Sequence, residues 1–358
     1  MSALLSVCIP THHGRRDLLR QAVDSVLDQI TVEAQADVTL HVSDNASADG
    51  SEELMRGYVA RHGGRVSYHR NEANLGLTRN LLAAVEDAPG TFCWLLGSDD
   101  VLFSGAIARM LELLRAHSDV AGVTTNRAMA DYHNLEVLRY DPEVELPEDP
   151  RQVHVYRSAP DAFVNCGLLH DFMSTQVIRR EWWRDAVAST SVEHLDRTRM
   201  APLEVIGLMI LGHPVWMWCP DALVRHRTGT SFLDEELGHR HYRYQLEIME
   251  DRAEVWSALL GRNSRLYLAV MRKACLRSLV PQEVGSFKLR SGESSLRMDL
   301  ELLVGMTHHF WRIPDFWLHR FPLLLLPSPL VRVLLPPAMP LIRGWSRLRA
   351  ASRARGAA

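Results

Sequence analysis

The first 126 residues alternate between short apolar runs and segments with helical periodicity. "LLSVCIP", "DVTLHVSD", "RVSYHRN" and "TFCWLLG" have the length and composition of buried strands. The segments between them, "RRDLLRQAVDSVLDQ", "GSEELMRGYVARHG" and "LGLTRNLLAAVEDA", repeat apolar residues every three or four positions, as amphipathic helices do. Strand and helix thus alternate three times before residue 100, which predicts a doubly wound, mostly parallel α/β sheet.

Polar residues follow each predicted strand, at the point where a ligand of such a sheet is expected to bind. They are Pro10 and Thr11, Asp44 and Asn45, Asn71 and Asn74, and Asp99 and Asp100. Because the carboxyl ends of parallel strands share one edge, we expect these residues to converge. The adjacent carboxylates of Asp99 and Asp100 repel each other unless a cation or a hydrogen-bonded ligand offsets the repulsion.

The pattern continues beyond this edge. A helix, "GAIARMLELLRAH", and a strand, "VAGVTTN", lead to residue 126, and residues 140–152 are rich in proline and acids, as an exposed connection would be. "DFMSTQVIRREWW" and "VWMWCPDALVRHRTGTSF" are predicted strands, separated by a helix around Leu203 to Leu211. We predict one domain over residues 1–232, with a first half (about 1–126) and a second half (about 150–232), and a helical extension over 233–315, helical from Glu235 to about Leu279.

Composition and motifs exclude several functions. The chain has 40 basic and 43 acidic residues, so it lacks the basic field on which nucleic-acid binding usually depends. Its five cysteines form no C-x-x-C pair, which favours reduced thiols over a zinc site. No G-x-G-x-x-G follows the first strand, which argues against a nicotinamide oxidoreductase. The N-terminus lacks the charged start and long apolar stretch of a signal peptide, so we expect a cytoplasmic protein.

The C-terminal segment, residues 316–358, is apolar, proline-rich and basic. Residues 321–343 hold six prolines, which are too many for a membrane-spanning helix. Five arginines and no acid lie between Arg343 and Arg355, beside Trp345, as in segments that lie on an anionic lipid surface. We therefore predict a peripheral location on the inner face of the cell membrane; a partner-binding or frayed tail is the alternative.

Several motifs resemble a known family. "SVCIPTHHGRRDLLRQAVDSVLDQ", "HVSDNASADGSEEL", "YHRNEANLGLTRNLLAAV", "FCWLLGSDD" and "VRHRTGTSF" occur in the order found in family 2 glycosyltransferases with the GT-A fold, in particular abequosyltransferase-like members. The resemblance covers roughly residues 5–232 and implies a nucleotide-binding half over about 1–126 and an acceptor half over about 150–232. It implies a nucleoside-diphosphate sugar as donor and a divalent cation, Mg²⁺ or Mn²⁺, that neutralises the leaving diphosphate.

The resemblance assigns roles around the acid pair. Asp100 would bind the metal with help from His226, and Asp99 would contact the ribose or a metal-bound water; Ser98 stands where the family commonly has a third carboxylate. The alternatives are a solvated turn for the acid pair and a structural role for His226. Asp44 would accept from the ring N–H of uracil or thymine, or else close a turn by bonding to Ala46 or Ser47.

The remaining donor-binding residues come from neighbouring turns. Pro10, Thr11 and Arg15 would lie beside the base and diphosphate, although His12 and His13 replace the family's usual aromatic residue and asparagine. Asn45 is expected at the same edge. Asn74, Gly76 and Arg79 would form an element that approaches the ligand, with Arg79 reaching a phosphate. Arg225 would pair with phosphate or with acids of the connection, and Asp171 would contact a sugar.

Inverting transfer requires a general base for the acceptor hydroxyl. Asp196 is the first candidate, followed by Glu193 and Glu204, and for each a plain surface carboxylate is the alternative. The function predicted is sugar transfer, possibly of a deoxy sugar, to a hydroxyl of a lipid-linked oligosaccharide in cell-envelope polysaccharide synthesis. The alternatives are transfer to a soluble small molecule and a degenerate sugar-nucleotide-binding membrane scaffold. A sugar nucleotidyltransferase would need a glycine-rich phosphate loop, which "PTHHGRRD" does not provide.

Overall fold

A computed structural model of the chain describes residues 3–30, 36–140, 152–197, 200–227, 241–279, 284, 288 and 296–331. The chain forms two compact units. The first contains residues 1–231 and 254–266, and the second contains residues 232–253 and 267–358. Parts of three predicted elements lie outside the described residues: most of the connection 140–152, the residues 235–240 of the predicted helix, and the tail beyond residue 331.

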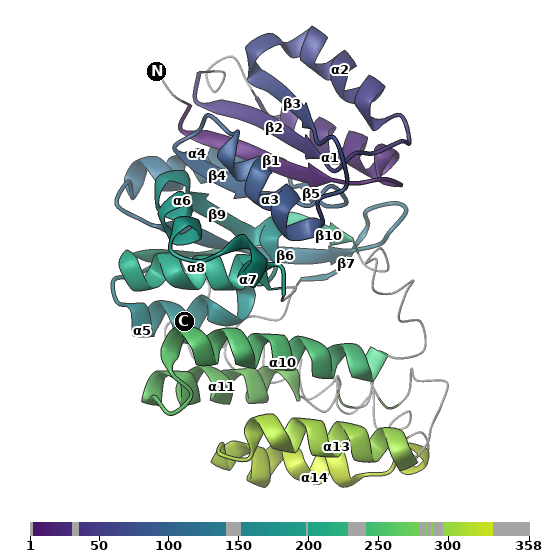
Figure 1. Cartoon of the computed structure of the whole chain (residues 1–358), viewed down its shortest axis with the longest axis vertical. Helices are drawn as coiled ribbons and strands as arrows, with labels where there is room; N and C mark the ends of the chain where they lie inside the picture. The colour runs from purple at the N-terminus through teal and green to yellow at the C-terminus, as the bar shows by residue number, and fades with distance from the viewer. Residues whose placement is uncertain are drawn as a thin grey trace, which may run out of the picture. The chain divides into compact units, whose positions relative to one another are not determined.

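The first unit is built on one mixed sheet with the strand order β3-β2-β1-β4-β9-β6-β10-β5, while β7 pairs with β6 and β8 with β10. The strands are β1 (Leu5–Thr11), β2 (Val38–Asp44), β3 (Val66–Arg70), β4 (Phe92–Leu95), β5 (Val101–Leu102), β6 (Gly122–Ala130), β7 (Val137–Tyr140), β8 (His154–Tyr156), β9 (Gln176–Arg179) and β10 (Trp216–Arg227). Figure 1 shows β1 to β4 side by side in the first unit.

The predicted α/β sheet is confirmed, but it also contains the antiparallel strands β5, β7, β8 and β9. Strands β1, β2, β3 and β4 are parallel, and so are β6 and β10. Between these two groups lies β9, which runs antiparallel to both β4 and β6. The sequence predicted a strand in this segment but not its reversed direction, because a short apolar run carries no signal for direction.

The helices of the first unit are α1 (Arg16–Leu27), α2 (Ser51–His62), α3 (Leu77–Glu86), α4 (Ala106–Ala116), α5 (Ala159–Cys166), α6 (Arg180–Ala188), α7 (Val192–Leu195) and α8 (Ala201–Gly212). Helix α1 buries Leu19, Ala22, Val23 and Val26 in the same core cluster as β1 and β2, on the face that the sequence pattern predicted. Helices α2 and α3 each begin after a glycine with positive φ, Gly50 at 86° and Gly76 at 83°. Glycine tolerates this conformation, so the chain can turn sharply from strand to helix at the carboxyl edge of the sheet.

The second unit is helical. It contains residues 241–253 of α10 (His241–Leu260) and residues 267–278 of α11 (Arg265–Ser278). It also contains α13 (Leu296–Phe310), a π-helix (Phe316–Arg320) and α14 (Phe321–Leu325). Phe316 and Leu324 are buried, so the described part of the predicted tail packs within this unit. None of the helices in the described part of the chain combines the length and apolarity that crossing a bilayer requires.

The core of the first unit contains a buried histidine, His170, whose ring makes no hydrogen bond to any described residue. The His170 side chain is completely buried, its ring meets Trp216 edge to face at 5.0 Å between centroids, and both of its nitrogens lack a described partner. Burial lowers the pKa of His170 to about 3, because desolvation disfavours the charged ring.

This buried ring should make the fold sensitive to acid. The unfolded ring takes up a proton near pH 6.5 and the folded ring does not, so the unfolding free energy should fall by about 1.4 kcal/mol per pH unit below 6.5. We expect His170→Phe to reduce this slope in denaturant titrations between about pH 7 and pH 5, over which the loss is roughly 2 kcal/mol. His69→Phe, at an exposed position, is the control. Equal slopes in wild type and His170→Phe would contradict the assignment.

Candidate active site

The acid pair lies at the end of β4, and Asp100 is the more buried member. The Asp100 side chain is 3% exposed and that of Asp99 24%. Asp100 Oδ2 accepts a hydrogen bond from Ser174 Oγ at 2.5 Å, and Oδ1 accepts one from the Arg227 backbone N–H at 3.2 Å. His226 Nδ1 lies 3.1 Å from the same Oδ1. Residues from the end of β10 and from the turn before β9 therefore hold this carboxylate, and the predicted pairing of Asp100 with His226 is present.

Asp99 is held by a cation from the first turn of the chain. Arg15 Nη1 lies 2.9 Å from Asp99 Oδ2. Burial and then the neighbouring charge of Asp100 raise the pKa of Asp99, and Arg15 offsets part of this rise. The pair thus carries an electrostatic strain that a further positive charge would relieve.

Gly97 leaves a space between the two carboxylates. A Cβ at this position would lie 3.0 Å from Asp99 Oδ1, 3.1 Å from Ser174 Oγ and 3.4 Å from Asp100 Oδ2. Any side chain here would crowd both acids, whereas glycine leaves oxygen atoms of the two carboxylates around one small cradle. Hard divalent cations prefer such oxygen ligands, so the residues present fit Mg²⁺ or Mn²⁺. In the described part of the chain, however, no group of three or more His, Cys, Asp or Glu residues forms a complete metal site.

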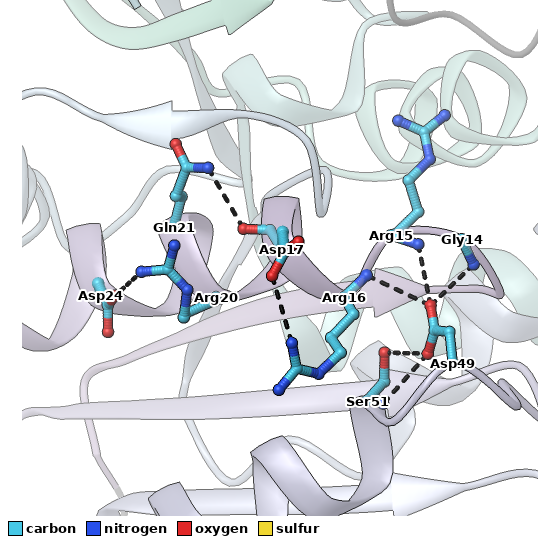
Figure 2. Close-up of polar contacts among 9 residues, drawn as sticks. All are labelled: Gly14, Arg15, Arg16, Asp17, Arg20, Gln21, Asp24, Asp49 and Ser51. Carbon is cyan, nitrogen blue, oxygen red and sulfur yellow. Dashed lines mark hydrogen bonds and ion pairs between the residues drawn. The ribbon is translucent and has the colours of Figure 1, made fainter. Parts of the chain in front are cut away.

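Arg15 is positioned by Asp49, a residue that sequence reasoning did not select (Figure 2). Asp49 Oδ2 accepts from the backbone N–H groups of Gly14 at 2.8 Å, Arg15 at 3.1 Å and Arg16 at 3.3 Å. Its Oδ1 accepts from Ser51 N at 3.1 Å and Ser51 Oγ at 2.6 Å. Burial alone would raise the pKa of Asp49, but the hydrogen bonds from Ser51, Gly14 and Arg16 outweigh it and lower the pKa. The start of α1 is thus capped by a carboxylate from the loop after β2.

Four asparagines connect the ends of the first three strands to α3. Asn80 Nδ2 donates to the carbonyl oxygens of Thr11 at 3.1 Å and Ser43 at 3.2 Å, and Asn71 Nδ2 donates to Asn80 Oδ1 at 3.0 Å. Asn45 continues the network: its Nδ2 donates to Asn74 Oδ1 at 2.6 Å and to the Gly76 carbonyl at 3.3 Å. The predicted residues Pro10, Thr11, Asn45, Asn74 and Gly76 therefore lie along one edge, as the strand ends indicated.

Asp44 fills the turn-closing role that was the alternative for it. Its Oδ1 accepts from Ser47 N at 3.0 Å and from the Ser47 hydroxyl, and its Oδ2 accepts from the Tyr68 hydroxyl at 2.6 Å. Burial and the neighbouring carboxylate raise the pKa of Tyr68, so this hydroxyl remains a donor. Asp44 has no exposed surface in this structure. Its contact with a base stays a prediction.

Two of the three candidate bases meet Arg79. Arg79, in the first turn of α3, donates from Nε to Asp196 Oδ2 at 2.8 Å and from Nη2 to Glu193 Oε1 at 3.4 Å. The third candidate, Glu204, lies in the first turn of α8 and is 5% exposed. Its Oε1 is 2.8 Å from His194 Nε2. The structure therefore brings Asp196 and Glu193 to the "NLG" element and pairs Glu204 with a different residue.

Two further residues were predicted to contact the ligand, Arg225 and Asp171. The Arg225 guanidinium lies 4.4 Å from the centre of the Phe103 ring, which it covers as a cation–π partner. Asp171 precedes Phe172, whose ring meets His226 at 4.5 Å and Arg127 at 3.8 Å. Phe172 and Ser174 thus line the site although the sequence analysis did not select them. Their segment, "DFMSTQ", contains no motif that marks a ligand contact.

Comparison with known proteins identifies the family. A family profile described as "Glycosyl transferase family 2" matches residues 6–185. The chain belongs to glycosyl transferase family 2. The predicted membership is thereby confirmed, and the match covers all residues from β1 to the middle of α6, including the acid pair and Asp49.

Among curated proteins, the chain is similar to abequosyltransferase RfbV of Salmonella typhimurium, with 30% identity over 189 residues. The match covers 51% of this chain and 55% of the relative, so the chain spans about half the length of that protein.

Solved structures confirm the predicted GT-A-type fold. S. aureus TarS 1–349 superimposes with a TM-score of 0.54 at 15% identity, covering 88% of this chain and 89% of that chain. The complex of the same protein with UDP gives a TM-score of 0.53 at 14% identity, covering 88% of this chain and 91% of that chain. The mannosyltransferase PcManGT from Pyrobaculum calidifontis, in complex with GDP-Man and Mn²⁺, gives 0.53 at 13% identity, covering 93% and 88%. At these identities the likeness concerns the fold alone.

The Asp49 cap should contribute measurably to stability. Asp49→Ala removes the acceptor for three backbone N–H groups at the start of α1, and loss of such a cap commonly costs about 1–2 kcal/mol. We expect a decrease of this size in chemical denaturation. The matched control is Asp17→Ala, which removes a largely exposed carboxylate from the first turn of the same helix. If both variants are equally stable, Asp49 is not the cap of this helix.

Proposed function

We propose that the chain is an inverting, metal-dependent glycosyltransferase that moves a sugar from a nucleoside diphosphate to an acceptor hydroxyl. The observation that carries this proposal is the cradle between Asp99 and Asp100 at the carboxyl edge of the sheet. Family membership supports the reaction class, and similarity to an abequosyltransferase suggests a deoxy sugar as the transferred group.

The charges of the site account for the choice of donor. A nucleoside-diphosphate sugar brings about two negative charges to an edge that already holds two carboxylates, so a cation must lie between them. Asp99 and Asp100 would hold this cation, and His226 beside Asp100 would complete the protein ligands. When bound, Mg²⁺ or Mn²⁺ supplies a Lewis acid that stabilises the departing diphosphate. Because described side chains offer few ligands, oxygen atoms of the donor would fill the remaining positions.

Arg15 adds a second positive charge at the same place. It is fixed at its backbone by Asp49 and at its guanidinium by Asp99, and 13% of its side chain is exposed. A guanidinium held in this way can donate to a phosphate oxygen without losing further conformational entropy. Arg15 would therefore orient the diphosphate, while the asparagine network keeps the turns after β1, β2 and β3 in place around the donor.

Asp196 remains the preferred general base. Arg79 holds its carboxylate next to Gly76, in the element that the donor sugar would approach. The carboxylate is one-third exposed, so an acceptor hydroxyl can reach it. It would take the proton from this hydroxyl as the oxygen attacks the anomeric carbon from the face opposite the diphosphate. Glu204 is nearly buried and engaged by His194, which makes it less accessible to an acceptor.

The acceptor that suits the rest of the chain is a lipid-linked oligosaccharide used in cell-envelope polysaccharide synthesis. The apolar, basic sequence beyond residue 315 suits a protein that works on the inner face of the cell membrane, where such acceptors are presented.

Activity with and without metal tests the function. The wild-type chain should release sugar from one member of a panel of nucleoside-diphosphate sugars, and only with Mg²⁺ or Mn²⁺ present.

Asp196→Asn should lower this rate of sugar release by about 100-fold or more, as loss of a general base commonly does, while donor binding persists. Glu193→Gln removes the other carboxylate on Arg79 and is the matched control.

Two outcomes would contradict these assignments. Donor release that is equally fast with a chelator would refute the metal-dependent reaction. A near-normal rate in Asp196→Asn would transfer the role of base to Glu193 or Glu204, and a slow Glu193→Gln or Glu204→Gln would then identify which.

A further inference from the structure

Helix α13, which Figure 1 shows beside α14, carries apolar side chains on two opposite sides. Its inner side buries Met298, Leu302, Met306 and Phe310, and Met298 packs against Leu246 of α10. On the other side, Leu296 is 79% exposed and Leu300, Val304 and Trp311 are each 59% exposed. The spacings of four, four and seven residues place these side chains in one stripe. We call Leu296, Leu300, Val304 and Trp311 the outer stripe.

Aromatic and aliphatic residues extend this surface. Trp317 Nε1 donates to the Trp311 carbonyl at 2.8 Å, so the two indole side chains belong to the same end of α13. Other large apolar residues of the segment that follows are also exposed, namely Leu318, Leu325, Leu326 and Leu330. Soluble proteins rarely leave large contiguous apolar patches open to water, and such patches mark interaction sites. Tryptophan is the residue preferred where an apolar surface meets lipid headgroups.

The charges around the outer stripe do not oppose an anionic partner. Residues 296–331 contain three acidic residues, Asp299, Glu301 and Asp315, and all three are engaged by cations of the same unit. Lys288 lies 3.0 Å from Asp299, Arg243 and Arg297 lie 3.0 and 2.9 Å from Glu301, and Arg272 lies 2.7 Å from Asp315. No acid of this segment is therefore left to repel phosphate groups.

Three partners could cover the outer stripe: residues 332–358 of the same chain, a second copy of the chain, or a lipid bilayer. The composition of residues 332–358 favours the bilayer. Residues 332–358 carry six arginines and no acid. If this segment itself covered the outer stripe, its charges would face acids that are already paired. A second copy would bring an equally basic tail against the first. An anionic bilayer accepts the apolar side chains and the arginines together.

We infer that the outer stripe, with Trp317, inserts into the interface of an anionic lipid bilayer. The inference deepens the membrane location within the proposed function by naming the surface that makes the contact. Lipid binding needs neither donor nor acceptor, so the failure of this inference would leave the transfer reaction untouched.

Vesicle co-sedimentation of the full chain tests this surface. The wild type should bind vesicles of phosphatidylcholine with roughly 30% phosphatidylglycerol more tightly than pure phosphatidylcholine. Leu300→Glu combined with Val304→Glu should weaken binding to the anionic vesicles by at least about tenfold, since two apolar contacts become charges of the wrong sign. Leu296→Glu alone, at the most exposed position of the outer stripe, should weaken it as well and is the variant least able to disturb folding.

The control is Leu138→Glu combined with Leu211→Glu, which places two glutamates at exposed leucines of the first unit. It should bind as the wild type does. Unchanged binding by the outer-stripe variants would overturn the inference. So would a wild type that ignores vesicles but forms dimers that Leu300→Glu and Val304→Glu dissolve, because the occupant would then be a second copy.

Discussion

The repulsion between two adjacent carboxylates at the end of a buried strand is the constraint on which the candidate site depends. Asp100 is kept in place by donors from the turn before β9 and the end of β10, while Asp99 is held by Arg15. Arg15 is in turn placed by Asp49, so the acid pair recruits residues from four separate segments of the chain. Arg15 offsets only part of the repulsion between the two carboxylates, and this remaining cost is the basis of our proposal that the pair binds a divalent cation.

The periodicity of the sequence was sufficient to locate most of the structure that supports this site. Buried strands and amphipathic helices have strong local signals, and parallel strands place their carboxyl ends together, so the edge with Thr11, Asn45 and Asp99 could be predicted. The direction of β9 could not, because direction depends on which strands it pairs with. Ser174 could not be predicted either, because it lies 74 positions from Asp100 in the chain and only the fold brings the two side chains together.

The side-chain partners of several site residues could not be predicted, because they depend on which groups the folded chain brings within hydrogen-bond distance. Asp44 follows β2 as a ligand-binding residue would, but Tyr68 and Ser47 are closer partners in the folded chain and bury it. Asp49 lies within the family motif "HVSDNASADGSEEL" but was not selected as a site residue, although its two oxygens join the loop to α1 and α2. Arg79 and Asp196 were both selected from the sequence, yet their ion pair joins residues 117 positions apart and could only be seen in the structure.

The central claim is that the acid pair holds a nucleoside diphosphate through a divalent cation, and calorimetric titration measures this directly. UDP, TDP, GDP and CDP would be titrated into the wild type, Asp100→Asn and Asp131→Asn, with Mn²⁺ or with chelator; Asp131, a partly exposed turn aspartate outside the acid pair, is the control. We expect Mn²⁺ to tighten binding of one nucleotide by at least about tenfold in the wild type and in Asp131→Asn, and not in Asp100→Asn. Equal affinity with and without Mn²⁺, or a full metal effect in Asp100→Asn, would contradict the account.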